Sequence, residues 1–177
     1  MWERGNRAPK RCSLWLTMLA SQPTMDSSSV DAEFKAARDL HSAGRWPEAS
    51  QRFEALMKRM RTANTLTPER ERALVDLLVS CYRSMSEHGK ALPLAQRSVE
   101  LTLALRGPTS EMYPASRLAV GHAYTGLGRF KEASRETQAV LTIFEERGDG
   151  LIGCFAPLAV IAFEVGVGIP AGAGTAV

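Results

Sequence analysis

The chain of 177 residues contains little cysteine, no long apolar run and no excess of one charge over most of its length. Its cysteines, Cys12, Cys81 and Cys154, are an odd number without a CxxC pair, which argues against a disulfide framework and against a zinc site. A reducing compartment fits this pattern best. No run approaches the roughly 18 apolar residues that a membrane-spanning helix needs, so we expect no membrane span.

Charge is balanced once the segment before Asp26 is set aside. That segment carries four basic residues against Glu3, and the rest of the chain has 18 basic and 18 acidic residues. A nucleic-acid-binding protein needs a basic surface to neutralise phosphates, so the composition indicates no nucleic-acid partner. The 45% hydrophobic and 23% charged content is typical of a soluble globular protein.

The N-terminal segment is predicted to be separate from the folded domain. In residues 1–25 a basic stretch precedes a short apolar run at residues 14–20. We interpret it as a flexible extension, with a targeting peptide as the alternative. The expected location is therefore cytoplasmic, or an organelle if residues 1–25 act as a targeting signal. Translation from Met1 and translation from Met25 both remain open.

A sequence repeat organises most of the chain. The string GRWPEAS at residues 44–50 returns as GRFKEAS at residues 128–134, and Ala91 lies midway between Ala49 and Ala133. When the copies are aligned at this spacing, apolar or small residues occupy many of the matched positions, for example Leu40, Tyr82 and Tyr124. The middle copy departs from the string, because Ser86-Glu87-His88 replaces Gly-Arg-aromatic. The resulting 42-residue period indicates a repeat protein.

Each copy shows apolar residues at spacings of three and four, which predicts a pair of amphipathic helices. The expected helices are residues 30–43 and 47–61, 67–85 and 90–105, and 112–127 and 131–147. Alternating apolar and polar residues typical of strands are not sustained anywhere, so the predicted fold class is all-α. The repeats are expected at about 30–66, 67–108 and 109–148, within a domain at residues 26–166.

Residues in the repeated strings have structural roles. Gly44 and Gly128 fall where the chain must reverse, which favours a positive φ. Trp46 and Phe130 are predicted to fill the seam between one helix pair and the next. Close approach of two helices requires small side chains at the crossing. Such residues are Ala37, Ala49, Ala91, Gly121 and Ala133.

After the third copy the pattern breaks off. Residues 154–166 resemble the first helix of a fourth copy, and residues 167–177 form a small, apolar tail without helical periodicity. We expect a truncated fourth repeat followed by a disordered tail. Because solenoids normally end in a helix with a polar outer face, an end of this kind predicts exposed apolar surface and self-association.

Helix pairs with these small, aromatic and G-x-[FYW]-x-E-A positions resemble tetratricopeptide (TPR) repeats, and the 42-residue period is similar to the kinesin light chain type. The resemblance implies a right-handed α-solenoid of antiparallel helix pairs, whose first helices line a concave groove. It also implies a non-enzymatic adaptor or scaffold that binds a peptide or partner helix. The asparagine pairs that bind peptide in kinesin light chains are absent, since residues 116–121 read SRLAVG.

Carrying over the inward positions of the repeat gives the candidate groove residues, namely Phe34, Lys35, Arg38, His41, Asp76, Leu77, Ser80, Arg83, Leu118, Ala119, His122 and Thr125. The basic residues Lys35, Arg38 and Arg83, together with two histidines, favour an acidic segment or a C-terminal carboxylate as the ligand. The alternative is a solvated charged face without a specific ligand.

No set of residues indicates catalysis, a cofactor or a metal. His41, His88 and His122 lack the spacing of metal ligands, and Cys81 is expected to be a buried, inert thiol. Gly126-Leu127-Gly128 ends a helix instead of following a strand, so it is not a dinucleotide fingerprint. The predicted protein is therefore not an enzyme. The alternatives are a structural fragment of a longer TPR protein without binding of its own, and a regulatory accessory domain of an enzyme or motor complex.

Overall fold

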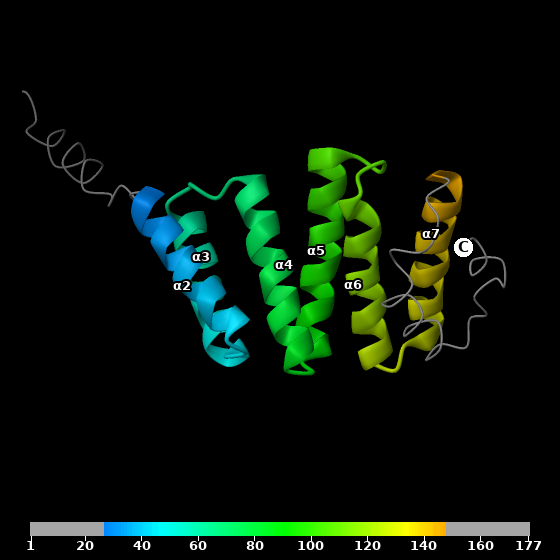
Figure 1. Cartoon of the computed structure of the whole chain (residues 1–177), viewed down its shortest axis with the longest axis horizontal. Coiled ribbons are helices and arrows are strands. Elements are labelled where there is room, and N and C mark those ends of the chain that lie inside the picture. The colour runs from blue at the N-terminus through cyan, green and yellow to red at the C-terminus, as the bar shows by residue number, and fades with distance from the viewer. Residues whose placement is uncertain (1–26, 148–177) are drawn as a thin grey trace, which may run out of the picture.

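The computed structural model describes residues 27–147, which form six α-helices and, within those residues, no strand (Figure 1). The helices are α2 (Ser27–Ser42), α3 (Trp46–Thr62), α4 (Pro68–Ser84), α5 (His88–Arg106), α6 (Met112–Gly126) and α7 (Phe130–Arg147). Each of the six predicted helices is present, with ends within a few residues of the expected ones. The all-α prediction is confirmed.

The helices stand side by side in chain order, from α2 and α3 at one end of Figure 1 to α7 at the other. Each helix packs against the next one along the chain, and α2 also touches α4. Contacts restricted to sequence neighbours are the defining property of a solenoid, in which each repeat is stabilised by the adjacent one. Across the described helices, none is long and apolar enough to cross a membrane.

The three turns within the pairs have one backbone geometry. Gly44 and Gly128 have φ of +75° and +71°, which confirms the predicted positive φ. Ser86 occupies the same place in the middle copy with φ of +58°, a conformation that costs a side-chain-bearing residue about 1 kcal/mol. In each turn an amide donates to the carbonyl five residues earlier, as in the 2.8 Å bond from Glu87 to Tyr82.

Small residues lie at the helix crossings as predicted. Ala37, Ala49, Ala91 and Ala133 are at most 1% exposed, and Gly121 is buried. The larger Val79 takes this place in the middle pair. The core between the pairs is filled by Phe53, Leu56, Met60, Leu74 and Leu78.

The core also contains the thiol of Cys81. This side chain is fully buried and unpaired, and burial raises its pKa, so it is protonated at neutral pH. A protonated buried thiol is a poor nucleophile, which agrees with the interpretation of Cys81 as a small apolar residue.

The two aromatic residues of the repeated strings behave differently. Trp46 is half-buried and lies edge-on against the ring of His41, with centroids 4.9 Å apart. Phe130 is 49% exposed, so it does not fill a seam as predicted. Its ring lines a concave pocket instead.

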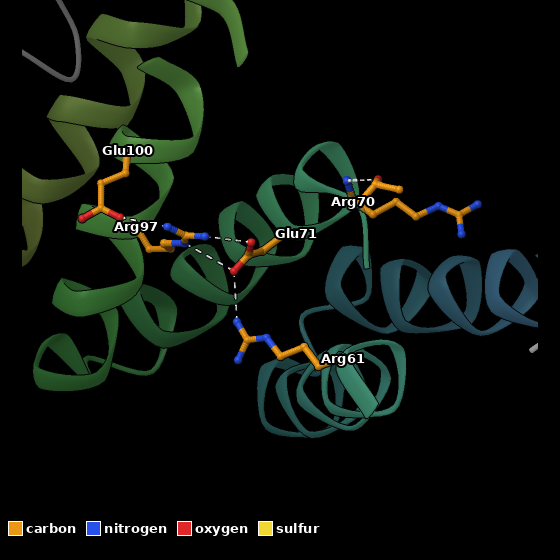
Figure 2. Close-up of polar contacts among 6 residues, drawn as sticks. Arg61, Arg70, Glu71, Arg97 and Glu100 are labelled. Atoms are coloured by element: carbon orange, nitrogen blue, oxygen red, sulfur yellow. Dashed lines mark hydrogen bonds and ion pairs between the residues drawn. The ribbon is translucent and has the colours of Figure 1, made fainter. Parts of the chain in front are cut away.

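A cluster of ionic contacts joins three consecutive helices around Glu71 (Figure 2). Glu71 lies in the first turn of α4 and its side chain is only 13% exposed. It accepts hydrogen bonds from Arg61 Nη2 of α3 at 3.0 Å and from Arg97 Nη2 of α5 at 3.0 Å. The hydrogen bond from Arg97 is the main reason why the pKa of Glu71 is lowered. The cluster therefore ties the second helix pair to the first.

The predicted extension at residues 1–25, the half repeat at residues 154–166 and the tail at residues 167–177 lie outside the described residues, and they remain predictions.

Candidate peptide groove

Two adjoining hollows lie between α4 and α6, the first helices of the second and third pairs. The larger, which we call the Arg83 hollow, has a volume of about 810 Å³. It is lined by Ser80, Arg83, Ser84, His88, His122, Thr125, Gly126 and Phe130. The smaller, which we call the Asp76 hollow, has a volume of about 420 Å³. Its lining includes Arg72, Asp76, Ser80, Arg83, Ser98, Thr102, Glu111 and Ala119.

Both hollows are lined by Ser80 and Arg83, so they adjoin, and together they are called the α4–α6 groove below. Helix periodicity explains the lining of α4: Asp76, Ser80 and Arg83 are four and three residues apart, so they lie on one face. On α6, His122 and Thr125 are three residues apart and share a face in the same way.

Arg83 is a charged side chain without a partner. No hydrogen bond or ion pair connects its guanidinium to any residue in the described part of the chain, although its surface remains accessible. Its surroundings exclude enough water to lower its pKa, yet an arginine stays protonated at neutral pH. A guanidinium carries five donors, so Arg83 offers an unused binding group to the groove.

His122 faces Arg83 across the Arg83 hollow. Burial is the main cause that lowers the pKa of His122 to about 4, and the charges of Arg83 and His88 lower it further. The imidazole is therefore neutral at pH 7, with one nitrogen able to donate and the other able to accept. The hollow thus has one permanent positive charge with two imidazoles close to it.

His88 enters the hollow from the first turn of α5 and packs against α6. A Cβ added at Gly126 would overlap the His88 ring, so this close approach requires glycine. The Nδ1 atom of His88 is buried and has no hydrogen-bond partner among the described residues. Burying an unsatisfied polar atom is unfavourable, so the packing of His88 against Gly126 has a local free-energy cost.

In the Asp76 hollow the carboxylate of Asp76 is already paired. It accepts a hydrogen bond from Arg72 Nη1 at 2.6 Å and another from the hydroxyl of Ser98. Thr102 also lines this hollow from α5. It is 1% exposed, and its hydroxyl is buried and lacks a partner within residues 27–147.

The structure brings together several of the residues predicted from the repeat pattern. Asp76, Ser80, Arg83, Ala119, His122 and Thr125 line the α4–α6 groove. His41 is linked to it by a 2.9 Å hydrogen bond between its Nε2 and the hydroxyl of Ser80.

Other predicted residues lie elsewhere. Phe34 packs against Phe53 with ring centroids 5.9 Å apart, Leu77 is partly buried against the core, and Leu118 is 8% exposed. Lys35 and Arg38 are exposed and do not line either hollow. Of the three predicted cations, Arg83 therefore lines the groove and the other two do not.

The groove also contains residues that the pattern did not select. His88 carries a signal in the sequence, because it lies midway between Trp46 and Phe130, at the aromatic position of the repeat. Arg72, Thr102 and Glu111 carry no such signal, since their place in the groove depends on how neighbouring pairs pack.

The stacked helix pairs and their concave groove define a TPR-like repeat protein of the all-α class. Folds of this kind commonly mediate protein–protein interactions and are typically non-catalytic. The structure is similar to the crystal structure of a Podosopora anserina protein assigned as a kinesin light chain with nearly identical TPR-like repeats. The TM-score is 0.66 at 19% identity, over 85% of this chain and 74% of that chain. The sequence matches no protein-family profile and no curated protein.

Proposed function

We propose that this chain is an adaptor or scaffold that binds an extended peptide or a partner helix in the α4–α6 groove, without catalysis. The ligand places an acidic group, either a side chain or a C-terminal carboxylate, on Arg83. The odd number of cysteines in the sequence supports a cytoplasmic setting for this interaction.

The unpaired guanidinium of Arg83 carries the proposal. Some arginines of the helices have carboxylate partners, as Arg59 has Glu33 and Arg117 has Glu136, whereas unpaired ones such as Arg52 lie outside both hollows. Arg83 lies in a concave site without such a partner. A carboxylate can accept two parallel hydrogen bonds from a guanidinium, which is a strong and directional contact.

The Asp76 hollow gives a second reason to expect a peptide. It adjoins the Arg83 hollow and adds a volume of about 420 Å³. A ligand with a carboxylate alone would occupy the Arg83 hollow and leave the second hollow empty. A peptide whose acidic group lies on Arg83 can extend into both hollows.

A peptide-array experiment tests the proposal. The full chain is applied to degenerate decapeptides with one fixed Asp, Glu or free C-terminus, and to matched arrays with Asn, Gln or an amidated C-terminus. We expect selective binding to the acidic arrays, weakened at least about tenfold by Arg83→Gln. The control is Arg52→Gln, which removes an exposed arginine of α3 outside the groove.

Three outcomes are distinguishable. Selective binding that depends on Arg83 and not on Arg52 supports the proposal. Equal binding by the wild type and the Arg83→Gln variant would remove the groove assignment. Absence of any selective binding would favour the structural fragment instead.

A further inference from the structure

The Arg83 hollow contains more nitrogen donors than one carboxylate can use. Arg83 from α4, His88 from α5 and His122 from α6 converge on it from three different helices. Among the described residues that line it, none is acidic. The hollow therefore has no internal counter-charge for an incoming anion to displace.

Hydroxyl groups add to these donors. Ser84 lies at the end of α4 and lines the hollow, and its hydroxyl has no hydrogen bond to another described residue. Ser80 lines it too, and its hydroxyl is held by His41 at 2.9 Å. Thr125 lines it as well, but its hydroxyl already donates to the carbonyl of Gly121 at 3.1 Å.

The number of acceptors on the ligand distinguishes two kinds of anion. A carboxylate has one charge and two oxygens, which the fork of Arg83 alone can satisfy. A phosphate monoester has a charge near −2 at neutral pH and three strongly accepting oxygens. Only the second kind would use the lining side chains of Arg83, His88, His122 and Ser84 together.

We propose that the Arg83 hollow is a phosphate-binding site, and that it takes the phosphorylated serine or threonine side chain of a peptide lying in the α4–α6 groove. This inference rests on the proposed function, because it specifies the acidic group of the same peptide ligand.

The shape of the groove favours a peptide over a small phosphate. The Arg83 hollow adjoins the Asp76 hollow, which adds about 420 Å³. A free phosphate or phosphorylated metabolite would occupy one hollow and leave the other empty. A phosphopeptide can extend over both.

The test uses three degenerate peptide pools that differ only at a fixed central residue, which is phosphoserine, glutamate or serine. Binding of each pool to the full chain is measured by competition against one labelled phosphopeptide from the first pool. Inorganic phosphate and free phosphoserine serve as additional competitors. We expect the phosphoserine pool to bind at least tenfold more tightly than the glutamate pool, and the serine pool to bind weakest.

Two variants assign the binding to the hollow. Arg83→Gln is expected to abolish the preference for phosphoserine. His88→Phe introduces the aromatic residue found at this position in the third copy, so it keeps an aromatic ring there and removes the nitrogens. We expect this variant to bind the phosphoserine pool several-fold more weakly, while the Arg52→Gln control binds like wild type.

The outcomes separate the two proposals. If the glutamate pool binds as tightly as the phosphoserine pool and depends on Arg83, the phosphate assignment is overturned and the proposed function stands. If no pool binds, both fail. If free phosphoserine competes as well as the peptide pool, the ligand is a small phosphate and the peptide part of the inference is overturned.

Discussion

Glu71 and Arg83 lie near opposite ends of the same helix, and their charges have different surroundings. Around Glu71, near the start of α4, the neighbouring helices supply Arg61 and Arg97, so the charge is paired within the protein (Figure 2). At the end of α4, the Arg83 hollow is lined by His88 and His122 and by no carboxylate of the described residues, while Asp76 and Glu111 line the adjoining hollow. The charge of Glu71 therefore stabilises the stack of helices, whereas the charge of Arg83 is available to a ligand.

The difference comes from which side of α4 each residue occupies. Glu71 makes contacts that connect α3, α4 and α5, where helix pairs are held together. Arg83 is on the face of α4 that opens toward α6 across the groove. Arg83 is exposed and has no partner among the described residues, so its charge contributes little to folding and is available to a ligand.

The largest expected effect on stability is that of Glu71→Gln. Removing the charge weakens the hydrogen bonds from two arginines, and we expect a loss of about 1 to 2 kcal/mol of unfolding free energy in urea denaturation. The expected loss of unfolding free energy is small because the side chains of Arg61 and Arg97 are 56% and 45% exposed, so water partly screens their charges. Glu48→Gln is the control, since its ion pair with Arg45 is exposed on both sides and should contribute less than about 0.5 kcal/mol.

The stability contribution of Glu71 should depend on pH in a defined direction. Its pKa in the folded protein lies below the ordinary value of 4.5, so its contribution is fully present above that pH. As the pH falls through the lower folded pKa, the carboxylate becomes protonated and the contribution is lost. The difference in unfolding free energy between wild type and Glu71→Gln should hence be constant from pH 8 to 5 and shrink below 4.5. A difference that grew on acidification would contradict the assignment.

A smaller effect on stability is expected for Arg83→Gln. Because Arg83 has no partner in the described part of the chain, its replacement should change the unfolding free energy by less than about 0.5 kcal/mol. Urea denaturation of this variant beside Glu71→Gln measures the contrast directly. A loss as large as that of Glu71→Gln would mean that Arg83 stabilises the fold, and the comparison between the two charges would be wrong.

Most of the fold could be predicted from the sequence because the same pattern of small and apolar residues occurs in three copies. The 42-residue step aligned Ala49, Ala91 and Ala133, and all three are buried. Gly44 and Gly128 showed where the chain reverses. Ser86 shows the limit of such reasoning, because it adopts the same positive φ without being a glycine.

The site was less predictable because it depends on packing between repeats. The inward positions of one repeat predicted Arg83 and His122, which do line the groove. The same rule also selected Phe34, which the first pair uses for its core. It did not select His88, whose ring reaches the groove by packing on Gly126 of the next pair. A rule based on single repeats contains no information about such contacts.

The most direct test of the central claim is an NMR pH titration of the His122 imidazole, with and without a phosphopeptide from the pool. In the free protein we expect a pKa of about 4, because burial and the charges of Arg83 and His88 oppose protonation. A bound phosphate would offset these charges, so the pKa should rise when the peptide is added. An ordinary pKa near 6.5 in the free protein, or a pKa that the phosphopeptide leaves unchanged, would contradict an anion site at Arg83 beside a desolvated His122.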